Sequence, residues 1–221
     1  MPGSIRKAER QDTALAVAGV AAAAFAFCSA LFLSSSVTND LEKLQRLYNR
    51  QRVQSVVQGV DQNEMHLIDY TKGYAMWDDT YTFLETRDPT YLTENYSESV
   101  MRVSPAELVA IYDLEGRMIF SAALDESGKT MPPPDGLKRF AKLEHFQQLK
   151  TVDSSLGRVE WIGDHPYLIA VCPVTDSAGT APIRGYFLFG AVIGEKMLKR
   201  LENLTEVELS VSAEAEPKER G

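Results

Sequence analysis

The sequence is poor in the residues that cross-link small folds or bind metals. Among its 221 residues there are only two cysteines and three histidines. Cys28 and Cys172 lie in two separate apolar runs, so no disulfide framework is expected. The histidines at positions 66, 145 and 165 do not have the spacing of zinc ligands. The sequence therefore predicts no metal site and no cofactor.

Sequence motifs of nucleophilic catalysis and of phosphate binding are also missing. The chain has no Gly-X-Ser-X-Gly elbow and no glycine-rich phosphate loop. Asp164 and His165 stand directly before Pro166, which favours a role in shaping a hairpin turn. We therefore expect that the protein is not an enzyme.

Positive charge is the scarcer sign. The chain has 23 basic and 31 acidic residues, and residues 1–37 hold three of the basic and two of the acidic ones. The remainder carries a net charge of −9. An acidic surface argues against nucleic acid or anionic lipid as the partner of this part.

A run of 20 residues from Ala14 to Leu33 carries no charge. As a helix it would be roughly 30 Å long, which matches the hydrocarbon core of a bilayer. Basic residues precede the run at positions 6, 7 and 10, so residues 1–12 are expected in the cytoplasm. The sequence thus predicts a single-pass anchor over residues 13–37 of the bacterial inner membrane, with the rest periplasmic or extracellular.

A cleaved signal peptide is the alternative interpretation of the same run. Cys28-Ser29-Ala30 ends in small residues, although an apolar core of about 7–15 residues is usual for a signal peptide. Cleavage would leave a free periplasmic protein that binds a ligand or acts on another receptor in trans. A third possibility is a remnant that folds but transmits no signal.

A helical pattern follows from Val37 to about Glu85, without proline. Val37, Leu41, Leu44 and Tyr48 recur at steps of four, three and four, which is typical of a narrow stripe in a parallel dimer stalk. A single helix that lies on its own domain is the alternative.

The end of this helical pattern is the densest aromatic region of the chain. On a continuous helix, Tyr74, Trp77 and Tyr81 share one face, Asp78 lies close to that face, and Asp79 is rotated away. Aromatic rings beside a carboxylate would suit a cationic ligand. In the alternative, Trp77 and Tyr81 lock the helix to a sheet, and one of the two aspartates accepts hydrogen bonds from backbone groups of an adjoining loop.

After Pro105 the apolar residues follow the periodicity of strands. Asp88 and Pro89 first open a short helix, as N-cap and first helical residue. Strands are expected at 108–112, 117–120, 157–161, 167–174, 183–193 and 207–211, and helices at 137–149 and 194–204. This order predicts an α+β domain over residues 38–212, an antiparallel sheet of about five strands with flanking helices. Residues 213–221 form a polar tail.

The exported part resembles a known sensory family. The resemblance rests on the membrane anchor, the long helix and three segments: Tyr74-Ala75-Met76-Trp77-Asp78-Asp79-Thr80-Tyr81-Thr82-Phe83, Tyr112-Asp113-Leu114-Glu115-Gly116, and Cys172-Pro173-Val174 with Gly185-Tyr186-Phe187. They are similar to the CHASE domain of the fourth type, an extracytoplasmic sensor of bacterial receptors. The resemblance implies a PAS-like or Cache-like fold and a cytoplasmic diguanylate cyclase, phosphodiesterase or histidine kinase output domain, which is missing before Gly221.

The resemblance also implies a ligand between the sheet and its covering segments, where residues of the far strands would add contacts. We therefore expect a membrane-anchored sensor module that recognises a small ligand or a partner and transmits through its long helix, as a homodimer. The predicted ligand-binding residues are Tyr74, Trp77, Asp78, Asp79, Tyr81, Tyr112, Trp161, Tyr167 and Arg184.

Overall fold

The computed structural model of the protein describes residues 3–125, 127–140 and 146–212. Side chains are described for residues 25, 27, 29, 41–125, 127–138 and 146–212. The chain divides into two compact units, Met1–Gln54 and Ser55–Gly221. The second unit holds the sheet and the helices that pack on it.

Helix α1 (Gly3–Ala75) is one continuous α-helix, as the absence of proline after Pro2 permits. It ends ten residues before the expected Glu85, so the prediction of unbroken helix through the aromatic region is wrong. Trp77 is extended, with φ −120° and ψ 132°, and a second helix, α2 (Asp78–Thr86), begins directly after it. The carbonyl oxygen of Ala75 accepts a hydrogen bond from the Thr175 amide at 3.1 Å, so the sheet takes up the end of α1.

The expected membrane anchor, residues 13–37, lies mostly outside the described side chains. Within the described part of the chain, no helical segment combines the length and the apolar character that a membrane crossing requires. The anchor therefore stays a prediction from the sequence.

The remaining helices are short. They are α3 (Pro89–Asn95), α4 (Glu98–Met101), α5 (Leu137–Phe140) and α7 (Glu195–Thr205). Helix α3 begins as expected, since the Asp88 carboxylate accepts a hydrogen bond from the Thr90 amide and Pro89 follows it. The expected helix 137–149 is described in part: Leu137, Phe146 and Leu149 are buried as predicted, whereas Leu143 and Glu144 lie outside the described residues.

The sheet is antiparallel throughout and has six strands in the order β3-β2-β1-β6-β5-β4. The strands are β1 (Leu108–Asp113), β2 (Met118–Leu124), β3 (Thr130–Met131), β4 (Leu156–Ile162), β5 (His165–Val174) and β6 (Gly185–Val192). The α+β class is confirmed, but the count differs from the expected five. Two-residue β3 is too short to show a period, and the expected strand 207–211 does not form, because the Leu209 amide donates to Glu202 instead.

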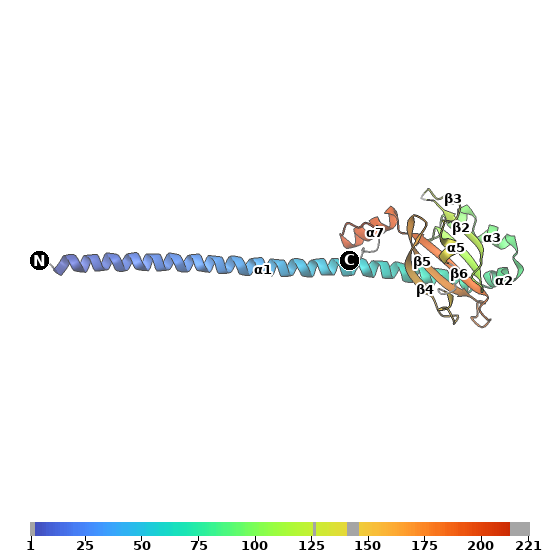
Figure 1. Ribbon diagram of the computed structural model, residues 1–221, viewed down its shortest axis with the longest axis horizontal. Helices are drawn as coiled ribbons and strands as arrows, with labels where there is room; N and C mark the ends of the chain where they lie inside the picture. Colours follow the sequence, from blue (N-terminus) through green and yellow to red (C-terminus); the bar gives the residue numbers. More distant parts are fainter. Residues whose placement is uncertain (1–2, 126, 141–145, 213–221) are drawn as a thin grey trace, which may run out of the picture. The chain divides into compact units, whose positions relative to one another are not determined.

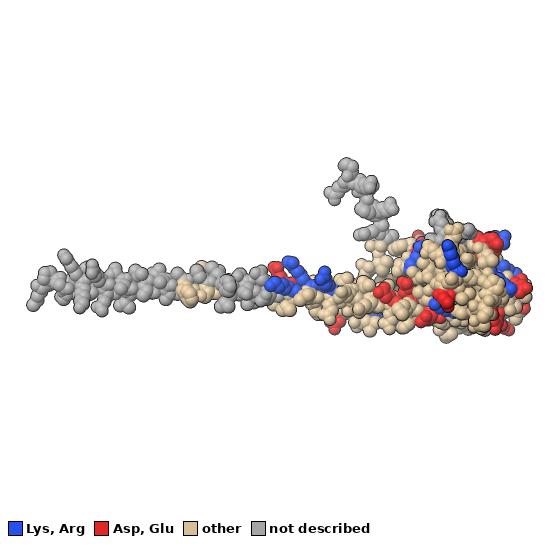
Figure 2. Space-filling view, turned by 90° about the horizontal axis from the view of Figure 1, so that it is seen from below, with Lys and Arg blue, Asp and Glu red and all other residues tan. Residues whose placement is uncertain are grey.

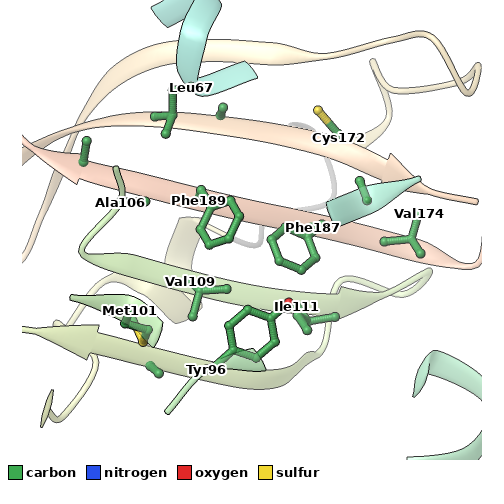
Figure 3. Close-up of a cluster of buried hydrophobic side chains, with 14 of the residues drawn as sticks. Leu67, Tyr96, Met101, Ala106, Val109, Ile111, Cys172, Val174, Phe187 and Phe189 are labelled. Carbon is green, nitrogen blue, oxygen red and sulfur yellow. The ribbon is translucent and has the colours of Figure 1, made fainter. Parts of the chain in front are cut away.

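Both faces of the sheet are buried, each by a different layer. One face packs against α1–α4, and Phe187 and Phe189 of β6 project into that layer beside Tyr96 (Figure 3). The other face packs against the segment that begins with α5, seen in front of the sheet in Figure 1, and contributes Tyr112 and Leu188. Cys172 is buried on the first face, as its apolar surroundings in the sequence predicted.

Two glycines allow close packing of α1 within the second unit. A Cβ at Gly157 of β4 would lie 2.5 Å from the Glu64 side chain, and a Cβ at Gly59 of α1 would lie 2.8 Å from Leu201 of α7. Both distances are far below van der Waals contact. The absence of a side chain therefore lets β4 and α7 approach α1.

Replacement of Leu67 by alanine tests whether this packing holds α1 on the sheet. Leu67 is 4 % exposed in the first core, so we expect Leu67→Ala to lower the free energy of unfolding by about 2–4 kcal/mol. Leu204→Ala is the matched control, because Leu204 of α7 is 73 % exposed, and it should change stability by less than about 0.5 kcal/mol. Urea unfolding measures both, and equal effects would contradict the packing.

Candidate functional site

The candidate site is an aromatic cluster where the end of α1 meets the sheet. Tyr74 is its centre: its ring stands edge-on to Trp77 at 6.0 Å and to Phe189 at 5.1 Å between centroids. Tyr70, one turn earlier on α1, lies 5.2 Å from Tyr74 and 5.0 Å from Phe189. The cluster thus joins the helix to β6 through ring contacts.

The short helices complete the cluster from the other side. Tyr91 of α3 packs on Phe83 of α2 at 4.9 Å, and Tyr96 contacts both Tyr91 and Phe120 of β2. Tyr91 and Tyr96 are only 8 % and 7 % exposed. In contrast, Tyr70, Tyr74, Trp77 and Phe120 are half-buried. The cluster therefore reaches from the surface into the core, and Trp77 is less buried than the sequence predicted.

The phenol groups of the cluster are held in their neutral form. Burial, followed by the hydrogen bond with Tyr70, raises the pKa of Tyr74 to about 12. Burial also raises the pKa of Tyr91 and of Tyr96, and the nearby Asp79 charge adds to the effect at Tyr91. At neutral pH these groups are consequently hydrogen-bond donors as well as acceptors.

The two adjacent aspartates take different positions at the start of α2. The Asp78 carboxylate accepts a hydrogen bond from the Ser177 amide at 2.9 Å, and the Asp78 amide donates to the Ser177 hydroxyl at 3.2 Å. Asp79 is exposed in the same first helical turn. Asp78 therefore satisfies a loop backbone donor, as the structural alternative predicted.

The loop that Asp78 contacts connects β5 to β6 and is ordered by Asp176. One oxygen of this carboxylate accepts from the amides of Thr180 and Ala181 at 2.7 and 2.9 Å. These hydrogen bonds, led by that from Ala181, lower the pKa of Asp176. A turn built on a charged acceptor thus braces the junction of α1 and α2.

Tyr81 and Arg184 form a separate pair beside the cluster. The Arg184 guanidinium lies 3.7 Å from the Tyr81 ring centroid and donates to the Tyr81 carbonyl at 3.1 Å and to Glu85 at 2.8 Å. This cation–π contact and ion pair fix the end of β6 to α2. The side chains of Tyr81 and Arg184 are thus paired with each other.

The remaining predicted site residues lie elsewhere. Tyr112 and Tyr167 are buried on the opposite face of the sheet, where the Tyr112 hydroxyl donates to the Leu137 carbonyl at 3.4 Å. Trp161 is 42 % exposed on β4, the last strand of the sheet. The structure therefore brings Tyr74 and Trp77 together and separates them from these three residues. Among the described residues, no group of three or more acidic, histidine or cysteine side chains is arranged for a metal ion.

Comparison with known families identifies the fold. The family model of the CHASE4 domain matches residues 60–212, which is more than half of the chain. The protein belongs to the CHASE4 family. Its members are extracytoplasmic sensor domains, so the family predicted from the Trp-Asp-Asp-Thr-Tyr string and the later segments is confirmed.

Solved structures similar to this CHASE4 domain share its architecture. The extracellular domain of vpHK1S-Z8, assigned as a histidine kinase, matches with a TM-score of 0.52 and 16 % identity over 69 % of this chain and 58 % of that one. A domain of a Vibrio parahaemolyticus protein assigned to the sensory box/GGDEF family matches with a TM-score of 0.52 and 15 % identity over 69 % and 61 %. The chain thus spans about three fifths of either structure, and at this identity the likeness concerns the fold alone. A search of curated proteins finds no match.

Several residues of the aromatic cluster were not predicted as site residues. Tyr91 and Tyr96 belong to short helices and their connection, and Phe187 and Phe189 to a strand with apolar residues at every position. From the sequence alone, each of these residues is typical of an ordinary hydrophobic core. Their joint placement depends on the break at Trp77, which turns α2 and α3 back over the sheet.

Exchange of the two aspartates for alanine separates their roles. Asp78→Ala removes the acceptor of the Ser177 amide, so we expect the free energy of unfolding to fall by about 1 kcal/mol more than in Asp79→Ala. Both changes remove one negative charge from the first turn of α2, so the helix dipole contribution is matched. Chemical unfolding of both variants measures the difference, and equal stability would show that the Asp78–Ser177 contact contributes nothing.

Proposed function

We propose that this CHASE4 protein is the input module of a bacterial signal-transduction receptor, anchored in the inner membrane by residues 13–37. It recognises a small ligand or a partner outside the membrane and passes the bound state through α1. The output domain would be a cytoplasmic diguanylate cyclase, phosphodiesterase or histidine kinase. No catalytic step is assigned to the module itself.

The course of α1 is the observation that carries this proposal. The helix is unbroken from Gly3 to Ala75, and its last two turns supply Tyr70 and Tyr74 to the aromatic cluster. A change in the contacts of these rings acts directly on α1. Two-state transmission requires such a differential contact between the ligand-bound and ligand-free states. The similarity to sensor domains of histidine kinase and GGDEF proteins supports the same role.

An apolar stripe on α1 supports self-association in the first unit. Leu41, Leu44 and Leu47 are 60–62 % exposed, and Tyr48 is 51 % exposed. Basic side chains gather in the same stretch of the helix, as Figure 2 shows. A second copy of the helix would remove the leucines from water, as in a parallel coiled coil.

The aromatic cluster is the proposed place of recognition. Tyr74 and Trp77 form its surface side, with Asp79 and Tyr81 nearby in the chain and Arg184, directly before β6, paired with Tyr81. Asp78 would act by holding the β5–β6 loop. Tyr112, Trp161 and Tyr167 remain alternative contact residues on the opposite face and at the edge of the sheet.

Membrane fractionation tests the anchor. If residues 13–37 span the membrane, the full chain expressed in bacteria should stay in the membrane fraction through salt and carbonate washes. A matched variant that places Arg at positions 20 and 24 should lose this retention, because each charge in the bilayer centre opposes insertion by about 2.5–3.5 kcal/mol. Release of the wild type with the soluble periplasmic fraction would favour the cleaved alternative.

Two aspartates in the apolar stripe test the dimer. Leu41→Asp with Leu44→Asp should raise the dissociation constant of the detergent-solubilised chain by at least about 100-fold, because each buried leucine contributes about 1.5–3 kcal/mol. Arg46→Gln with Asn49→Asp changes the net charge by the same −2 away from the stripe and should leave association unchanged. Light scattering measures both. A wild type that stays monomeric at working concentration would contradict the dimer.

A further inference from the structure

Five side-chain hydroxyls meet inside the aromatic cluster. The Tyr91 hydroxyl lies 2.5 Å from the Thr80 hydroxyl and 2.8 Å from the Tyr96 hydroxyl, so these three form a chain. The Tyr70 hydroxyl donates to the Tyr74 hydroxyl at 3.4 Å. The ring centroids of Tyr74 and Tyr96 lie 6.3 Å apart, so a ring contact joins the two groups of tyrosines.

A count of protons shows that this cluster has more hydroxyl donors than hydrogen bonds. Each hydroxyl donates one hydrogen bond, and the chain of three makes two, so one proton is left at its Thr80 end or its Tyr96 end. In the other pair Tyr70 donates, which leaves the proton of Tyr74. Within the described part of the chain, no further hydrogen bond is recorded for these hydroxyls. The chain of three is buried, and a donor removed from water without an acceptor costs about 1–3 kcal/mol.

The walls around these donors are uncharged. They are the rings of Trp77, Phe120, Phe187 and Phe189. The Asp79 carboxylate, exposed at the start of α2, acts on Tyr91, and its negative sign disfavours an anion. Asp78, the carboxylate that would pair with a cation, is occupied by the Ser177 amide. The groups that face inward are therefore donors that need a neutral acceptor.

We propose that the hydroxyl cluster of Tyr70, Tyr74, Tyr91 and Tyr96 is the recognition site, and that its ligand is a small uncharged molecule with an apolar body and a carbonyl oxygen. The oxygen accepts hydrogen bonds from Tyr74 and Tyr96, and the apolar body packs among the rings of Trp77 and Phe120. The half-buried Tyr70, Tyr74, Trp77 and Phe120 form the entrance. This inference rests on the proposed sensor function and names the chemical class of the ligand.

The position of the donors also explains how binding would reach α1. Tyr70 and Tyr74 belong to the last two turns of that helix, whereas Tyr91 and Tyr96 belong to α3 and the residue after it. An oxygen bound between Tyr74 and Tyr96 links α1 to the short helices. The ligand thus adds hydrogen bonds between two elements that the rings of Tyr74 and Tyr96 already join.

A probe series on the detergent-solubilised full chain tests the ligand class. The probes are acetophenone, benzoate and phenyltrimethylammonium, which share one ring and differ in charge. We expect acetophenone to raise the melting temperature and the two ions to bind at least about tenfold more weakly. Tyr74→Phe and Tyr96→Phe should each weaken acetophenone binding about tenfold, because each removes one hydrogen bond and keeps the ring.

Tyr186→Phe is the matched control, since it removes one phenol from the opposite face of the sheet and should leave the affinity unchanged. Loss of acetophenone binding in Tyr186→Phe but not in Tyr74→Phe would overturn the assigned site and leave the sensor function standing. Tighter binding of either ion would overturn the ligand class, and so would a wild type that acetophenone does not stabilise. If Tyr96→Phe fails to fold, half-buried Tyr74 still provides the test. Membrane fractionation and light scattering test the anchor and the dimer of the proposed sensor without any probe, so their outcome is independent of the ligand class.

Discussion

The burial of both faces of the sheet is the constraint on which the rest of the structure depends. The inner strands β5 and β6 carry apolar side chains at nearly every position, so neither face can be left to water. Helices α1–α4 cover one face, and the segment that begins with α5 covers the other. Each covering layer is consequently held by the sheet, and a movement of α1 must change its contacts with β6.

The end of α1 is fixed more firmly than packing alone would achieve. The Thr175 amide caps the Ala75 carbonyl, and two hydrogen bonds join Asp78 to Ser177 in the loop between β5 and β6. The polar groups exposed by the break between α1 and α2 are thereby satisfied by one loop. The same break brings α2 and α3 over the sheet and places buried tyrosines beside Tyr74. One interruption of the helix thus produces both the hydrogen bonds that fix the end of α1 and the candidate recognition site.

Much of the architecture follows from local patterns. The turn at Asp113–Gly116 forms as predicted, with the Asp113 amide donating to the Arg117 carbonyl and Gly116 at φ 76°. The Asp88 cap, the strands around Ile111, Ile169 and Phe187, and the buried position of Cys172 were predictable because periodicity and capping involve neighbours in sequence. The family was also predictable, since its motifs are contiguous strings.

What the sequence by itself determined is the set of elements: a long helix without proline, an antiparallel sheet and an aromatic region between them. Only the tertiary structure decided where α1 ends, because the capping Thr175 amide lies 100 residues away from Ala75. The helical wheel placed Tyr81 beside Tyr74, but the extended Trp77 turns Tyr81 towards Arg184 and admits Tyr91 and Tyr96 instead. Such partners are selected by packing between distant segments, which one-dimensional periodicity does not contain.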